Sequence, residues 1–299
     1  MSHHGRTALL LASALTVVVA ACSGGGASSP PSGDPSTAPS ATPSDAATIG
    51  HPTGATDVIL RYDEGGGFVM PAFVAANTPH FTLYGDGTVV VRDPAKEAPP
   101  AQGDAFVMNP LQVAKLSEAQ IQEVLAFALG EGGLAAARPE YLNQMISDAS
   151  TATFTIDTGD LKKSVAVYAL GLEDPTGADG PARAAFKRLA DRLVGLADGG
   201  AVVAADYVPE AYRVTIFDAP GVVATDLRTW PWDDVAVTDF KPSVDPNSNQ
   251  FPHLTMTPEQ VAQLGVTGYE GGFQNLVVTG SDGALYTLAV RPLLPGETE

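Results

Sequence analysis

The chain has 299 residues, of which 34 are acidic and 16 are basic, so its formal net charge is −18. Such an acidic protein is repelled by nucleic acid and by anionic surfaces, so we expect no nucleic-acid partner. One cysteine in the whole chain excludes an intrachain disulfide and any metal site built on several thiolates.

The chain begins with the pattern of a secretory signal peptide. Arg6 and the amino terminus are positive, residues 7–19 form an apolar run, and two alanines precede Cys22. The run is too short for a membrane-spanning helix, which needs about 20 apolar residues. We therefore predict a cleaved signal peptide over residues 1–21.

Cys22 ends the sequence VAAC, which resembles a bacterial lipobox, where a diacylglycerol is attached to the cysteine before cleavage in front of it. The alternative, an ordinary secreted protein with a stray cysteine, leaves the position of the only cysteine unexplained. One acyl chain binds a membrane only marginally, but a lipoprotein carries at least two. We predict a lipid-anchored protein on the extracytoplasmic face of the cell membrane, with no thiol left for chemistry.

The segment after Cys22 consists mostly of Ser, Pro, Gly, Ala and Thr, without apolar periodicity. Such a composition cannot bury enough surface to offset the entropy of ordering. We assign the lipidated cysteine and a disordered tether to residues 22–54. A flexible coil of about 28 residues spans about 30 Å on average, which suits a domain held away from a membrane.

The folded part begins with a β-rich stretch at 56–62, followed by the loop DEGGGFVMP at 63–71. Its three glycines alone are weak support for a phosphate site, and it has no lysine to hold an anion. At 80–93 two β-rich arms flank Gly85-Asp86-Gly87. Asp-Gly readily adopts the positive φ angles of a tight turn, so this stretch predicts a β-hairpin.

The clearest helix signal starts at Ser117, which forms a capping box with Gln120. Apolar residues then recur at helical spacing until Gly130 ends the pattern. This apolar stripe consists of Ile121, Val124, Leu125, Ala128 and Leu129.

A second hairpin is predicted at 151–170, around Thr158-Gly159-Asp160. A helix with Pro181 in its first turn follows. Its expected apolar stripe is Phe186, Leu189, Ala190, Leu193 and Ala197. Its expected opposite face carries Arg183, Lys187, Arg188 and Asp191.

Beyond residue 200 the pattern predicts a strand at 212–218, a short helix capped by Thr257 and ended by Gly265, and a third glycine-turn hairpin at 275–290. Because strands occur in hairpins rather than alternating with helices, the expected fold class is α+β, with antiparallel hairpins packed against a few helices. A helix followed by a hairpin occurs twice. We therefore predict two α+β subdomains, at 55–200 and 201–299.

Four stretches of the folded part are similar to known sequences: PHFTLYGDGTVVVRD at 79–93, LSEAQIQEVLAFALGEGGL at 116–134, WPW at 230–232 and RPLLPGE at 291–297. Together they resemble a group of uncharacterised lipoproteins and secreted proteins of actinobacteria. The resemblance covers most of residues 56–299. It implies no activity and no catalytic residue, because none is known for the group.

The sequence lacks the common catalytic signatures GxxxxGK[ST], HExxH, GxSxG and SxxK, and has no GxGxxG between a strand and a helix. The histidines outside the signal segment, His51, His80 and His253, are better explained as unrelated than as a shared metal site or triad. The stretch at 245–250 starts like an EF-hand loop but lacks its glycine and glutamate, which favours a polar turn. We predict no catalytic residue, metal or cofactor.

One stretch, TWPWDD at 229–234, suggests ligand binding through Trp230, Trp232, Asp233 and Asp234. Aromatic faces beside acids can hold a sugar, and carboxylate pairs serve glycosidases. Adjacent residues on a strand, however, point to opposite faces. A tryptophan plug in the core between subdomains is the favoured alternative.

Three functional hypotheses follow. The preferred one is an envelope-anchored lipoprotein whose domain binds or scaffolds an envelope protein or glycan without catalysis. The alternative is a hydrolase of wall glycan or peptide that uses carboxylates near the two tryptophans. A third is a module like a proteinase or lactamase inhibitor, with a protruding hairpin and a concave sheet.

Overall fold

The structure is a computed structural model that describes residues 48–92, 98–172, 177–197, 202–244 and 250–298. The predicted signal peptide, Cys22 and most of the tether lie outside these residues, as does the stretch 245–249. No helix in the described ranges is long and apolar enough to cross a membrane. Residues 47–299 form one compact unit.

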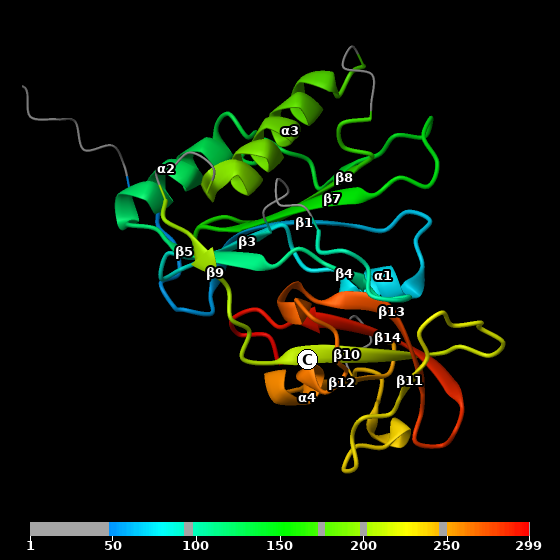
Figure 1. The fold of residues 1–299 in the computed structure, drawn as a ribbon. Coiled ribbons are helices and arrows are strands. Elements are labelled where there is room, and N and C mark those ends of the chain that lie inside the picture. Colours follow the sequence, from blue (N-terminus) through cyan, green and yellow to red (C-terminus); the bar gives the residue numbers. More distant parts are fainter. Residues whose placement is uncertain (1–47, 93–97, 173–176, 198–201, 245–249, 299) are drawn as a thin grey trace, which may run out of the picture. The chain divides into compact units, whose positions relative to one another are not determined.

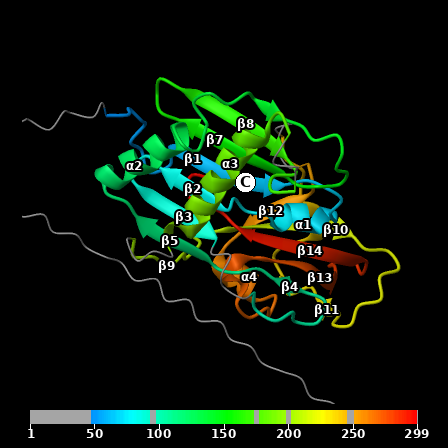
Figure 2. The same ribbon diagram turned by 90° about the horizontal axis from the view of Figure 1, so that it is seen from above.

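The first of two sheets has eight strands in the order β6-β8-β7-β1-β2-β3-β5-β9. All neighbours are antiparallel except the parallel pair β6 and β8. Its strands are β1 (Val58–Gly65), β2 (Phe81–Tyr84), β3 (Thr88–Arg92), β5 (Leu111–Lys115), β6 (Glu140–Tyr141), β7 (Thr151–Asp157), β8 (Lys162–Tyr168) and β9 (Ala205–Asp206). Helices α2 (Glu118–Leu129) and α3 (Gly180–Val194) cover one face of this sheet (Figures 1 and 2).

The second sheet follows the order β11-β13-β14-β10-β12, with β4 paired to β13. Its strands are β4 (Phe106–Val107), β10 (Tyr212–Asp218), β11 (Arg228–Thr229), β12 (His253–Met256), β13 (Phe273–Thr279) and β14 (Leu285–Pro292). Helix α4 (Pro258–Ala262) lies on the side away from the first sheet, and α1 (Pro71–Ala76) lies between the sheets (Figure 1). The described ranges also contain three short 3-10 turns: η1 (Gly195–Ala197), η2 (Val237–Asp239) and η3 (Tyr269–Gly271).

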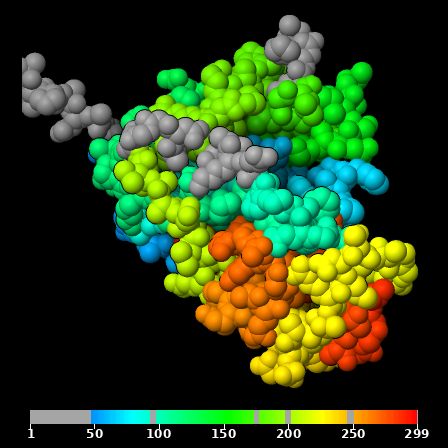
Figure 3. Space-filling view, in the orientation of Figure 1, coloured from blue at the N-terminus to red at the C-terminus, as the bar shows by residue number. Residues whose placement is uncertain are grey.

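The mostly antiparallel α+β prediction is confirmed, and all three glycine-turn hairpins form. In the first hairpin Gly87 has φ of 85°, and the Asp86 carboxylate accepts a hydrogen bond from the backbone N–H of Thr88 at 2.9 Å. The predicted boundary between subdomains at residue 200 stays a prediction. Two strands cross it: β9 joins the first sheet and β4 joins the second. Figure 3 shows the segments after residue 202 forming most of the lower half of this view.

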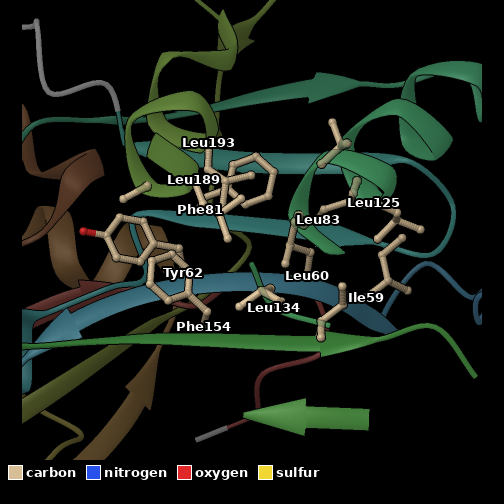
Figure 4. Packing of buried hydrophobic residues seen from close by; sticks show 14 of the residues in the cluster. Ile59, Leu60, Tyr62, Phe81, Leu83, Leu125, Leu134, Phe154, Leu189 and Leu193 are labelled. Carbon is tan, nitrogen blue, oxygen red and sulfur yellow. The ribbon is translucent and has the colours of Figure 1, made fainter. Parts of the chain in front are cut away.

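The main core lies between the first sheet and α2 and α3. On β7 every second side chain points into it, as the period of a strand requires, so Ala152, Phe154 and Ile156 are buried. Tyr62 stacks on Phe154 at 4.9 Å, near Leu189 and Leu193 of α3, and Leu125 of α2 packs further along the same core (Figure 4). Each large apolar side chain buried in this way contributes about 1.5–3 kcal/mol relative to its exposed state.

Helix α2 confirms its sequence signals. Ser117 and Gln120 form the expected capping box, and the buried residues are Ile121, Val124, Leu125 and Ala128, while Leu129 is only partly buried. The helix also holds the chain before β1. The Gln122 side-chain amide exchanges two 2.8 Å hydrogen bonds with the backbone of Ile49. Residues 48–54, which composition assigns to the tether, thus lie against the folded domain.

Helix α3 differs from its prediction at Arg183, which is buried rather than on the solvent side. Its guanidinium donates to the backbone carbonyls of Tyr168, Tyr141 and Leu142 at 2.9–3.1 Å. Helical spacing places Arg183 one turn from Phe186 and Lys187, so the pattern alone did not decide its face. The backbone carbonyls at the ends of β6 and β8 accept these hydrogen bonds and hold the guanidinium inside.

A second buried arginine, Arg92, connects the two sheets. Its guanidinium donates to Thr78 Oγ1 at 2.5 Å, to the carbonyl of Asn109, and to the carbonyl of Gly271, which precedes β13. Burial lowers the pKa of Arg92 to about 10, below its ordinary value of 12.5. A Cβ at Gly271 would lie 2.2 Å from the Asn109 carbonyl oxygen, so only glycine permits this approach.

Candidate functional site

The two sheets present to each other the faces that do not line their main cores. The second sheet has its own core, on the face that α4 covers. Tyr212, Val214 and Ile216 of β10 belong to this second core, so Arg213 points to the other face. On β1 the same alternation sends Tyr62 into the first core and turns Arg61 the other way. The layer between the sheets therefore contains these arginines as well as two small apolar clusters, one around α1 and Ala289 and one around Tyr84 and Leu294.

A cleft of about 800 Å³ occupies this layer. Its lining comes from β1, α1, β7, β10, β14 and the chain ends around them: Arg61, Asp63, Gly65, Val74, Ala75, Asn77, Pro79, Thr151, Thr153, Arg213, Gln250, Phe251, Arg291 and Glu297. The volume falls in the range of small-molecule sites, which is about 300–1,000 Å³.

Three arginines converge on the cleft from three strands. Arg213 and Arg291 are directly opposite each other in the β10–β14 register, and Arg61 reaches the cleft from β1. Residues opposite each other on an antiparallel pair have Cβ atoms about 5 Å apart, and like charges there are destabilising. Such an arrangement requires anions nearby.

One intramolecular anion is Glu297, which follows β14. Its Oε2 accepts hydrogen bonds from Arg291 Nη2 at 2.9 Å and from the backbone N–H of Leu294 at 3.0 Å. Its Oε1 lies 3.9 Å from Arg61 Nη2. Glu297 and Asp63 are the carboxylates among the described lining residues of the cleft.

Buried polar atoms on these faces also lack partners. Arg61 Nε, Thr82 Oγ1 and Thr215 Oγ1 are buried and have no hydrogen-bond partner among the described residues. Thr82 is opposite Arg61 in the β1–β2 register, and Thr215 lies two residues from Arg213 on the same face of β10. Buried polar groups are nearly always hydrogen-bonded in folded proteins. Arg61 lines the cleft, whereas Thr82 and Thr215 lie behind its walls.

Arginine suits this position because its planar guanidinium forms paired hydrogen bonds with carboxylate or phosphate oxygens and keeps its charge when partly buried. Thr151, Thr153 and Asn77 add neutral hydrogen-bonding groups to the walls. Asn77 is itself held in place, because its Nδ2 donates to the Glu64 carbonyl at 2.9 Å. The arrangement can hold an anion through charge-assisted hydrogen bonds.

The tryptophan motif lies elsewhere, on the core side of the second sheet. Trp232 is buried in that core, and Trp230 packs partly buried against it, with the two rings edge to face at 5.0 Å. The Trp230 indole N–H donates to the Val235 carbonyl at 2.6 Å, and the Trp232 indole N–H donates to the Gln260 carbonyl at 2.9 Å. Asp233 and Asp234 are exposed beside them. The tryptophans thus pack in a core, as the alternative expected, but this core belongs to the second sheet alone and does not lie between the two sheets.

The histidines take separate structural roles. His51 Nε2 lies 3.2 Å from Glu118 Oε1, His80 stacks on Tyr62 at 5.3 Å, and His253 is buried with Nδ1 2.8 Å from the Phe251 carbonyl. In the described ranges no group of three or more His, Cys, Asp or Glu residues could hold a metal ion.

The sequence analysis did not select Arg61, Arg213 or Arg291. Each is a single arginine in an otherwise apolar or alternating strand, so the sequence pattern could have placed each arginine on the non-core face of its strand. The pattern could not have predicted that the three arginines converge, because their convergence depends on how the two sheets stack. No family model, curated protein or solved structure matches the chain, so the functional argument relies on this geometry.

Proposed function

We propose that this protein is a lipid-anchored protein of the cell envelope whose folded domain binds an anionic ligand in the cleft between its sheets, without transforming it. The ligand carries a carboxylate or a phosphate, as a free small molecule or as a group on a larger envelope component. The observation that carries the proposal is the convergence of Arg61, Arg213 and Arg291 on one cleft.

The anchoring part of the proposal comes from the amino-terminal sequence. The only cysteine, Cys22, stands where lipidation requires it, after a short apolar run. A tether after it keeps the domain within reach of the membrane. A negatively charged domain is repelled by anionic lipid, so the tether and the arginine cleft have complementary roles: one holds the domain near the membrane and the other selects the ligand.

The binding part is tested by calorimetric titration of the full chain, produced without lipid, with inorganic phosphate and with succinate. We expect binding to wild type, weakened at least tenfold in Arg61→Gln and in Arg213→Gln, and weakened by rising salt. The matched control is Arg192→Gln on α3. Its side chain has an exposure similar to that of Arg61, 37% against 28%, and its partner is Glu123 rather than a cleft residue.

Absence of binding by wild type to either anion would overturn the proposal. So would equal loss of affinity in Arg192→Gln, because the effect would then reflect total charge rather than the cleft. Thermal unfolding of each variant separates weakened binding from lost folding.

A further inference from the structure

A second cavity, of about 570 Å³, adjoins the opposite end of α1. It is largely apolar and is lined by Met70, Pro71, Ala72, Ile216, Phe217, Asp218, Val237, Phe240, Pro252, Asn275, Tyr286 and Thr287. Asp218 is the one charged residue among these and is exposed, whereas five of the fourteen residues that line the arginine cleft are charged. The two cavities therefore differ sharply in chemistry.

They share the same strands. Arg213 lines the cleft and Phe217 lines the apolar cavity, four residues apart on one face of β10. Arg291 and Thr287 repeat this spacing on β14. Four residues of strand span about 13 Å, so these four residues run along one face of the second sheet from the cleft to the apolar cavity. Ile216 and Tyr286, which also line the apolar cavity, belong to the core face of the same strands. Phe251 and Pro252, adjacent in the chain, also line one cavity each.

Helix α1 sits across the middle of this surface. Its buried residues, Ala72, Ala75 and Ala76, pack on Ala289 of β14 with Phe217 beside them. Ala72 lines the apolar cavity and Ala75 lines the cleft, so one turn of α1 borders both. Alanine contacts bury little area compared with leucine or phenylalanine, so α1 is only lightly held to the strands.

The approach to the apolar cavity is apolar as well. Phe68 is 91% exposed and Met70 is 58% exposed, just before α1, and Phe73 and Val74 are exposed on α1 itself. An exposed apolar group beside a cavity marks an interaction site. Gly66 and Gly67, with φ of 83° and 78°, give the chain before these residues a conformation that other residues rarely adopt.

We infer that the ligand of the arginine cleft is an anionic amphiphile. Its anionic head binds Arg61, Arg213 and Arg291, and its apolar chain passes α1 to fill the cavity lined by Phe217 and Thr287. This inference rests on the proposed anion binding and names the chemical class of the ligand: one anionic group, carboxylate or phosphate, joined to one apolar chain. An acyl lipid and a free fatty acid or alkyl phosphate both meet this description.

The test compares two phosphates with the same head, methyl phosphate and decyl phosphate, the second kept below the concentration at which it forms micelles. Calorimetric titration of the full chain, produced without lipid, should show decyl phosphate binding at least tenfold more tightly. Trp230 packs at 5.9 Å on Phe240, which lines the apolar cavity. Tryptophan emission should therefore change with decyl phosphate and not with methyl phosphate.

Thr287→Phe fills the apolar cavity and should remove the gain from the decyl chain while methyl phosphate affinity stays within twofold. Thr229→Phe, the same substitution at an exposed position of β11 that lines neither cavity, is the matched control and should change neither affinity. Val237→Phe fills the cavity from another element and replaces Thr287→Phe if that variant does not fold. Arg213→Gln should weaken the binding of both phosphates.

Equal affinity for the two phosphates, with methyl phosphate still sensitive to Arg213→Gln, overturns the amphiphile inference and leaves the proposed anion binding intact. Decylammonium binding as tight as decyl phosphate also overturns it, because the apolar chain alone would then account for the affinity. If the wild-type protein does not bind methyl phosphate, the proposed function itself is contradicted.

Discussion

Glu297→Gln provides the sharpest test of the cleft, because it removes a negative charge that the arginines already face. The Glu297 carboxylate lies 2.9 Å from Arg291 Nη2 and 3.9 Å from Arg61 Nη2. Its negative charge therefore repels an anion that enters the cleft and offsets part of the attraction by the arginines. The glutamine retains an oxygen that can accept from the Leu294 N–H, so the turn after β14 should keep its shape.

The size of the effect follows from Coulomb's law. Two unit charges about 5 Å apart at an effective dielectric constant of about 20 repel by about 3 kcal/mol. The Glu297 side chain is 19% exposed, so solvent screens part of this and about 1–2 kcal/mol remains. Anion affinity should therefore rise about 5- to 30-fold. Because buried Arg291 loses its charged partner, the free energy of unfolding should fall by about 2 kcal/mol.

The assay is calorimetric titration with inorganic phosphate at fixed salt, together with urea unfolding of each protein. Glu123→Gln is the matched control, because it removes the same charge from an exposed ion pair with Arg192 on the helical side. Exposed pairs contribute about 0–1 kcal/mol, so this variant should change stability little. Its phosphate affinity should equal that of wild type.

A folded Glu297→Gln variant with unchanged or weaker phosphate affinity would refute the reasoning. It would show that the arginines serve only to balance Glu297 and Asp63 within the fold. An equal gain in Glu123→Gln would assign the effect to the net charge of the chain instead of the cleft.

Three further predictions concern the anchor, a buried arginine and a histidine. Cys22→Ser should release the protein from membranes or block its processing, checked by fractionation. Arg183→Met should lower the free energy of unfolding by about 3 kcal/mol, since three backbone carbonyls lose a donor. Arg188→Met, exposed on the same helix, should change it by less than about 0.5 kcal/mol. Burial lowers the pKa of His80 below 6.5, so stability should fall as pH drops below 6.5, where only the unfolded chain gains the proton. His80→Phe keeps the stack on Tyr62 and should flatten that dependence.

Local signals in the sequence determined the elements they mark. The capping boxes at Ser117 and Thr257 place the starts of α2 and α4, since cap chemistry involves residues three apart. The glycine turns place three hairpins, because a positive φ is nearly restricted to glycine at those points. The composition of the first residues determined the prediction of a lipid anchor without any fold.

Distant contacts decided the rest. Helix α1 has six residues, and its place between the sheets follows from packing of small side chains on Ala289. Arg183 turned inward because carbonyls 15 and 42 residues away needed a donor. Arg61, Arg213 and Arg291 are separated by long stretches of chain and meet only because two sheets stack on their non-core faces. The alternation along a strand predicts on which face of the sheet a residue lies, but not which other element packs against that face. The candidate site depends on this packing.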